Sequence, residues 1–263
     1  MLTKLLKYDL KYMIKNMSVF YILSIFFAIL TRILSLFETT TILVIVKNIT
    51  IGTLIAMIAN TLINTMIRSW IRFRDVIYKD ESYLTHTLPV TKNDIYNSKF
   101  IQTLIFYIIG FLVIVISLFI AFYSKDNWRI LKNVILGFTT NLNISTFLFV
   151  SGMLFIIFLE FFNAIQCGFL GIILGYRKNN GKIGFSILFG FIIYLVAQLL
   201  VLGVTALEGV FDSNIMDLFS NNIMLNGKSF ITLYGGATIL YVIIIFAMSF
   251  ICKKILNKGV NVE

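Results

Sequence analysis

The chain has little of what a soluble metalloenzyme needs. Its 263 residues include one proline, one histidine and two cysteines, and only 13% are charged. Soluble globular domains carry about 25% charged residues. A single proline also argues against a soluble fold rich in loops. One histidine excludes an HExxH motif and any site built from several histidines.

Neither the cysteines nor the glycines form a recognisable site. Cys167 and Cys252 fall in or beside long apolar segments, so they fit neither a disulfide framework nor a metal site. Residues 227–229 (GKS) are similar to the end of a phosphate-binding loop, but Asn222 stands where that loop begins with glycine. We therefore expect no ATPase or other catalytic activity, no metal site and no cofactor in this chain.

Long apolar runs dominate the rest of the sequence. Hydrophobic residues make up 59% of the chain, and the mean hydropathy is +0.94. A helix needs roughly 20 apolar residues to cross a bilayer, whereas barrel strands would alternate over about 10 residues. We therefore predict an all-α membrane protein whose residues 1–263 form one transmembrane domain with six spans. The predicted spans cover about residues 18–37, 42–67, 99–123, 144–176, 183–207 and 229–251.

The distribution of positive charge predicts the orientation of these spans. Six spans place both termini on one side of the membrane, and that side holds 16 of the 22 Lys and Arg residues. Cytoplasmic segments of membrane proteins are enriched in Lys and Arg. We therefore expect a multi-pass protein with both termini in the cytoplasm. The net charge of +10 then reflects orientation, and we expect no binding to nucleic acid.

Residues 1–17 differ from the spans in their pattern. Leucine and methionine recur there at three- or four-residue spacing, and four lysines fall mostly on the other side. This pattern predicts an amphipathic helix in the inner membrane interface; the alternative is a plain basic flank. A cleaved signal peptide does not fit, because the apolar run that follows is long and lacks a small-residue cleavage site.

Two further patterns concern the outer connections and helix packing. Residues 124–143 predict a helix on the outer surface, with one apolar stripe, and residues 208–228 predict one or two short helices. The stripe consists of Trp128, Leu131, Val134, Ile135 and Phe138.

Gly171 and Gly175 form a GxxxG motif, which permits close helix approach but is common by chance.

The longest polar interval between two spans is residues 68–98. Together with Lys99 it carries six Lys or Arg and four Asp or Glu, and it contains His86 and Pro89. We expect water or a partner protein to cover it, and we expect the flanking helices to project into the cytoplasm. Pro89 would end a short helix, because proline disfavours a helical conformation in the preceding residue. Thr91 would then cap the next helix.

The sequence from Tyr83 through TLPVTK (residues 87–92) to residues 98–99 (SK) resembles the loop between the second and third spans of ABC-2-type permeases. The amphipathic N-terminus and the six spans are similar to that family as well. In that family, two membrane subunits pair with two cytosolic ATPase subunits, and a coupling helix in this loop inserts into a groove on the ATPase. The alternative for this segment is a solvated turn. By resemblance, the coupling residues are Glu81, Tyr83, Leu84, Thr85, His86, Thr87, Leu88 and Pro89.

The resemblance implies a permease subunit of an ABC transporter in a bacterial cell membrane. The partners would be a cytosolic ATP-binding-cassette ATPase, which binds ATP and Mg, and a second copy or close paralogue of this chain. The chain is similar to Gram-positive exporters of amphipathic or antimicrobial-type peptides, such as the phenol-soluble modulin exporters. Alternatives are a permease for lipid, drug or sodium, an ion-gradient-driven transporter or channel, and a membrane-embedded enzyme or anchor.

Polar residues inside the predicted spans are candidates for lining a transport pathway. Glu160 is the one acid deep in a span, and Asn163 and Cys167 follow on the same face. Asn60 and Asn64 share a face of the second span, where we expect them to hydrogen-bond to a neighbouring helix. For Glu160, the alternative to a pathway role is a protonated or hydrogen-bonded side chain that holds helices together.

Overall fold

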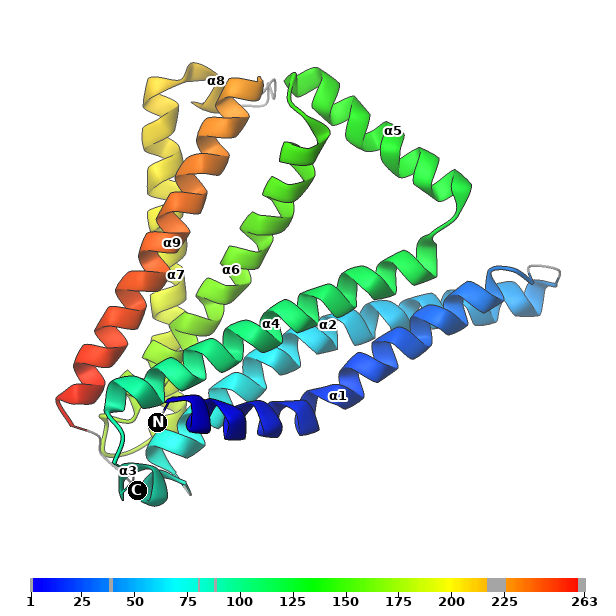
Figure 1. The fold of residues 1–263 in the computed structure, drawn as a ribbon. Coiled ribbons are helices and arrows are strands. Elements are labelled where there is room, and N and C mark those ends of the chain that lie inside the picture. Colours follow the sequence, from blue (N-terminus) through cyan, green and yellow to red (C-terminus); the bar gives the residue numbers. More distant parts are fainter. Residues whose placement is uncertain (1, 38–39, 80, 88, 217–225, 260–263) are drawn as a thin grey trace. The chain divides into compact units, whose positions relative to one another are not determined.

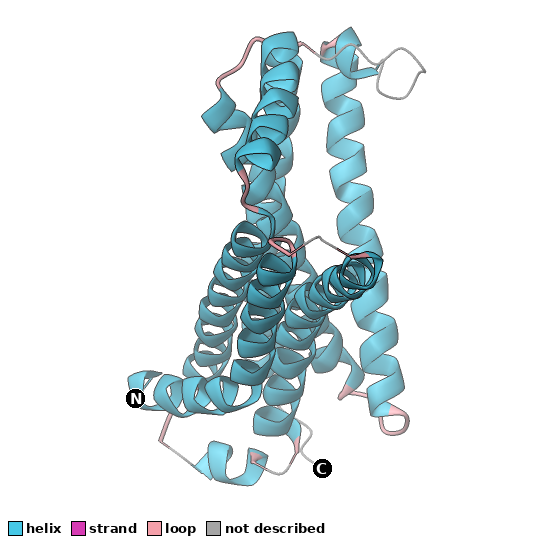
Figure 2. Ribbon diagram, turned by 90° about the vertical axis from the view of Figure 1, so that its right-hand side faces the viewer, coloured by secondary structure: helices cyan, strands magenta, loops and turns pink. Residues whose placement is uncertain are grey.

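The computed structural model describes residues 2–37, 40–79, 81–87, 89–216 and 226–259 (Figure 1). These residues fold into nine helices, and none of them forms a strand (Figure 2). The helices are α1 (Leu2–Leu34), α2 (Thr41–Tyr78), α3 (Ser82–Thr87), α4 (Lys92–Phe122), α5 (Lys125–Leu142), α6 (Thr146–Gly175), α7 (Lys182–Phe211), α8 (Ser213–Met216) and α9 (Gly227–Asn257). Six of them, α1, α2, α4, α6, α7 and α9, are long and apolar enough to cross a membrane. The prediction of an all-α chain with six such helices is confirmed.

The helices on either side of the polar interval extend into it, as expected. α2 continues to Tyr78 without a break, well past the predicted end of the second span near residue 67. The hydroxyl of Thr91 caps α4 by accepting a hydrogen bond from the Asp94 N–H at 3.1 Å. Both helices therefore extend beyond the apolar segments from which the spans were predicted.

The first helix is more continuous than the sequence predicts. An interfacial helix over residues 1–17 and a span beginning near residue 18 were expected, but α1 runs through both. Its N-terminal part, dark blue in Figure 1, lies at an angle to the rest of α1 in both ribbon views (Figures 1 and 2). The lysines of this part are exposed, whereas Met13 and Met17 are buried.

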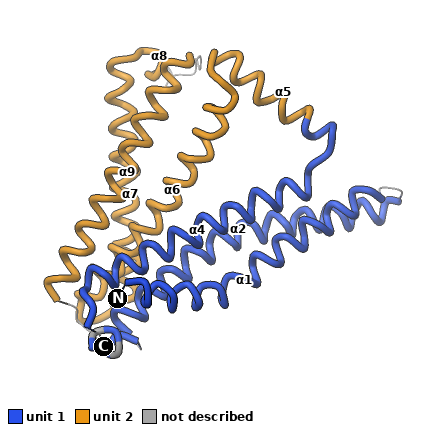
Figure 3. The backbone as a smooth tube through the Cα atoms, in the orientation of Figure 1, with its two compact units in different colours: residues 1–128, 262–263 blue, residues 129–261 orange. Residues whose placement is uncertain are grey.

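Two compact units make up the chain (Figure 3). The first contains residues 1–128, with α1, α2 and α4 packed side by side. Small and hydroxyl-bearing side chains bring these helices together, as is common between membrane helices. Ala28, Leu54 and Ala121 form one buried cluster. The Ser24 and Thr61 hydroxyls lie 3.1 Å apart across the contact between α1 and α2.

The second unit, residues 129–261, is built on α6, α7 and α9. α6 and α7 approach closely at Gly171 and Gly175. A Cβ atom on Gly171 would lie 2.5 Å from the backbone nitrogen of Gly190, and one on Gly175 would overlap the Ser186 hydroxyl oxygen. The GxxxG motif therefore lies at a real helix contact, where glycine allows the two backbones to touch.

The connection between α7 and α9 contains α8, one of the short helices predicted over residues 208–228. The remainder of that prediction falls on residues 217–225, outside the described residues. The carboxylate of Asp212 accepts a hydrogen bond from the Ser229 hydroxyl at 2.6 Å and another from the Asn214 side chain at 2.9 Å. The bond from Ser229, followed by that from Asn214, lowers the pKa of Asp212.

Candidate functional site

α3 forms the tip of the polar interval between α2 and α4. Its start is fixed by two backbone hydrogen bonds, from the Ser82 N–H to the Lys79 carbonyl at 2.7 Å and from the Glu81 N–H to the Asp75 carbonyl at 3.3 Å. Ser82 is buried, whereas Tyr83 beside it is 76% exposed. α3 thus has one face turned into the protein and one aromatic side chain turned outward.

The predicted coupling residues divide between these two faces. Thr85 is buried and donates its hydroxyl to the Glu81 carbonyl at 2.8 Å. Glu81, Tyr83, Thr87 and Pro89 are exposed. For two further predicted residues, Leu84 and His86, the structure describes the helical backbone but not the side chain, and Leu88 lies outside the described residues.

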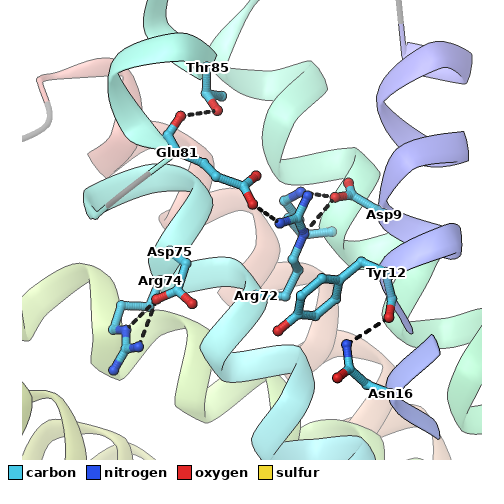
Figure 4. A network of polar contacts seen from close by, with 9 residues as sticks. Asp9, Tyr12, Asn16, Arg72, Arg74, Asp75, Glu81 and Thr85 are labelled. Carbon is cyan, nitrogen blue, oxygen red and sulfur yellow. Dashed lines mark hydrogen bonds and ion pairs between the residues drawn. The ribbon is translucent and has the colours of Figure 1, made fainter. Parts of the chain in front are cut away.

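A buried ionic cluster lies where α1, α2 and α4 meet the start of α3 (Figure 4). The Asp9 carboxylate accepts hydrogen bonds from Arg72 Nε at 3.0 Å, from the Ser98 hydroxyl at 2.6 Å and from the Lys99 ammonium. Arg72 Nη1 also donates to Glu81 Oε1 at 2.5 Å. These contacts connect side chains of α1, α2 and α4 with the residue that precedes α3.

The Tyr12 ring makes a further contact with the Arg72 side chain. Its guanidinium carbon lies 4.6 Å from the centre of the Tyr12 ring, a cation–π arrangement (Figure 4). In this cluster two cations face two carboxylates, so the opposite charges balance. Removing one partner from a buried pair leaves an uncompensated charge, which costs about 3–5 kcal/mol. The cluster therefore favours one relative arrangement of the helices that it connects.

Sequence reasoning missed this cluster. We expected water or a partner protein to cover the whole polar interval, and this is wrong for Arg72 and Lys99, which are 7% and 2% exposed. The missing partner was Asp9, which is 1% exposed and lies in the segment predicted to rest on the membrane. One signal was available: Asp9 is the only acid in residues 1–17, and it precedes the buried Met13 and Met17 at four-residue spacing.

The second candidate group lies inside the α6–α7–α9 bundle. Glu160 is half-buried and accepts a hydrogen bond from the Tyr194 hydroxyl of α7 at 3.5 Å. Asn163 and Cys167 are buried instead, with the Cys167 thiol 4.0 Å from Asn163 Oδ1 and 3.8 Å from the sulfur of Met248 in α9. The structure thus brings Asn163 and Cys167 together, while Glu160 bonds to Tyr194 of α7.

Asn60 and Asn64 occupy the surface of α2. Asn60 is exposed and Asn64 is half-buried. The Asn64 amide donates to the carbonyl of Asn60 at 3.0 Å, within the same helix. A hydrogen bond from these residues to a neighbouring helix remains a prediction.

The described residues contain no group of three or more His, Cys, Asp or Glu side chains that could hold a metal ion. The exposed Tyr83 on α3 and the buried cluster around Asp9 make up the candidate site. No family model matches the chain, and neither the curated proteins nor the solved structures gave a significant match.

Proposed function

We propose that the chain is the membrane-spanning permease subunit of an ABC transporter of the ABC-2 type. The supporting observation is α3, a short helix between two long helices that presents Tyr83 to the outside. A docking surface needs an aromatic or apolar anchor on a rigid support. Tyr83 supplies the anchor, and the buried cluster supplies the support. The ATPase partner would bind ATP and Mg and dock on Glu81–Pro89.

The contacts around Arg72 provide a route by which docking could move the membrane helices. Force applied to α3 reaches α2 through the bond between Glu81 and Arg72, and it reaches α1 and α4 through Asp9. The pairs of Asp9 with Arg72 and Lys99 are buried and resist separation, because each charge would lose its partner in a region that excludes water. In this account α1, α2 and α4 respond together when the ATPase moves α3.

The N-terminal part of α1 would lie in the inner membrane interface. Lys4, Lys7, Lys11 and Lys15 are exposed there, where anionic lipid headgroups can bind them. Asp9 and Met13 face the protein instead. This part of α1 would therefore act both as an interfacial helix and as one side of the ionic cluster.

The proposed substrates are amphipathic or antimicrobial-type peptides, exported across a bacterial cell membrane. A second copy or a close paralogue would complete the pathway, and the exposed Asn60 is a candidate for that contact. Glu160 would contribute a carboxylate to the pathway. A permease of the same type for lipid, drug or sodium remains the alternative within this class.

A second candidate function is an ion-gradient-driven transporter. It is favoured by Glu160, which lies within α6 and accepts a hydrogen bond from Tyr194 of the neighbouring helix. Intramembrane acids with such partners occur in proton relays. Transport by this mechanism would need no ATPase and would stop when the ion gradient is dissipated.

The experiment that tests the proposal is purification of the tagged chain from its native membrane, followed by reconstitution in vesicles. We expect a protein with a phosphate-binding loop and ATPase activity to copurify, and peptide transport by the vesicles to require ATP. Transport that proceeds without ATP and stops when the ion gradient is dissipated would contradict the proposal and support the second candidate.

A further inference from the structure

α5 is amphipathic, and most of its side chains are exposed. Only Thr139 and Leu142, near its end, are buried, and at that end the Phe138 ring meets Phe149 of α6. In the second unit it leaves the end of α6 at an angle (Figure 3). A helix of 18 residues is about 27 Å long. Most of its surface must therefore face water, lipid or another molecule.

The side chains of α5 separate into an apolar and a basic face. Trp128, Leu131 and Phe138 belong to the apolar stripe predicted from the sequence, and each is at least half exposed. Lys125, Arg129 and Lys132 recur at four- and three-residue spacing on another face and are exposed as well. A helix that is apolar on one side and basic on the other is typical of segments lying in the plane of a membrane.

Both ends of α5 are joined to helices that can cross a membrane. At its start the Asn127 N–H donates to the Ser124 hydroxyl at 3.0 Å, and the Trp128 ring lies 6.5 Å from that of Tyr123. At its end the Phe138 ring stacks on Phe149 of α6 at 5.9 Å. If α4 and α6 are successive spans, α5 begins and ends at the same face of the membrane, and it is confined to the level of that face.

We propose that α5 binds the outer leaflet of the bilayer and prefers anionic phospholipids there. Its apolar stripe would enter the boundary between headgroups and acyl chains, with Trp128 and Tyr123 in the aromatic belt. The three cations would meet lipid phosphates, and Asp126 is the one acid of the helix. A second copy packed on the basic face would set its three cations against the three of the first copy, which disfavours that occupant.

Tryptophan fluorescence of the full chain in vesicles tests this proposal. The chain has two tryptophans, so Trp70→Phe leaves Trp128 as the only one. In phosphatidylcholine vesicles with brominated lipid, we expect bromines near the headgroup end of the acyl chain to quench Trp128 more than bromines near its tip. Emission that no brominated lipid quenches would overturn the proposal, because water or protein would then cover α5.

The preference for anionic lipid is tested with trace brominated phosphatidylglycerol or trace brominated phosphatidylcholine. We expect phosphatidylglycerol to quench Trp128 several-fold more effectively. The ratio of quenching by phosphatidylglycerol to quenching by phosphatidylcholine should fall close to one in the variant that combines Lys125→Gln, Arg129→Gln and Lys132→Gln. A matched control, Lys4→Gln with Lys7→Gln and Lys11→Gln, removes the same charge from exposed positions of α1 and should leave the ratio unchanged. An unchanged ratio in the α5 variant would show that its cations do not select the lipid and would overturn that part of the proposal.

Discussion

Arg72 and Asp9 are 63 residues apart in the chain, and Nε of Arg72 donates to Oδ1 of Asp9 at 3.0 Å. Both side chains are almost completely buried. This contact holds α2 against the N-terminal part of α1, and the bond from Arg72 to Glu81 extends it to the start of α3. The position of the candidate coupling helix therefore depends on a residue near the N-terminus.

Replacement of Asp9 should destabilise the protein strongly. Asp9→Asn keeps the size of the side chain but leaves Lys99 buried without its carboxylate. We expect a loss of about 3–5 kcal/mol in stability, the usual cost of breaking a buried ion pair. Thermal unfolding of the purified protein in detergent would measure it.

Asp75→Asn is a matched control for this variant. Asp75 pairs with the adjacent Arg74, and both side chains are about one quarter exposed. Pairs of this kind contribute about 0–1 kcal/mol, so we expect little change in the unfolding temperature. Equal destabilisation by the two variants would show that the cluster around Asp9 has no special structural role.

The contact between α6 and α7 should be sensitive to a single methyl group. Gly171→Ala places a Cβ against the backbone of Gly190, which cannot move away without shifting α7. Overpacking of this kind costs about 1–3 kcal/mol. Gly203→Ala is the control, because that glycine lies in α7 with no atom within 4 Å of an added Cβ. Thermal unfolding that is unaffected by Gly171→Ala would mean that the two helices are not in close contact.

Much of the fold follows from local sequence patterns. The length of the apolar runs predicted the number of membrane-type helices, and the extension of α2 to Tyr78 agrees with the expectation that the helices beside the polar interval project beyond those runs. The capping of α4 by Thr91 was predictable because the bond closes within three residues. Such features depend on neighbours in the chain, and a single sequence contains that information.

The ionic cluster depends on contacts between distant segments, and the sequence alone did not predict it. The bond between Asp9 and Ser98 joins residues 89 positions apart. A buried lysine such as Lys99 has the same local sequence signature as a solvated one. The GxxxG motif illustrates the same limit, because Gly171 becomes informative only when Gly190 is seen against it.

Cysteine labelling should establish which ends of the helices face the cytoplasm. Both native cysteines are buried and can be replaced by alanine. Both positions are exposed, and the topology predicted from the charge distribution puts them on opposite sides of the membrane. We therefore expect an impermeant reagent added outside intact cells to label Asn133→Cys in α5 but not Asn179→Cys. Labelling of Asn179→Cys from outside would reverse the proposed topology.

Glu160→Gln should separate a pathway role from a purely structural one. The substitution removes the charge but keeps an oxygen that can accept the hydrogen bond from Tyr194. If the carboxylate lines the pathway, we expect lower peptide export by a protein that unfolds at the wild-type temperature. Tyr194→Phe removes the hydrogen bond and leaves the carboxylate in place. Unchanged export by Glu160→Gln would favour a role in holding helices together.

The most direct test of the central claim compares two exposed tyrosines. Tyr83 on α3 is 76% exposed and Tyr8 on α1 is 71% exposed, and both are predicted to face the cytoplasm. Each would be replaced by alanine, and the amount of ATPase that copurifies with the chain would be measured along with its affinity. We expect Tyr83→Ala to lose about 2 kcal/mol of binding free energy, as for an interface anchor, and Tyr8→Ala to bind like the wild type. Undiminished ATPase binding by Tyr83→Ala would contradict the assignment of α3 as the coupling helix.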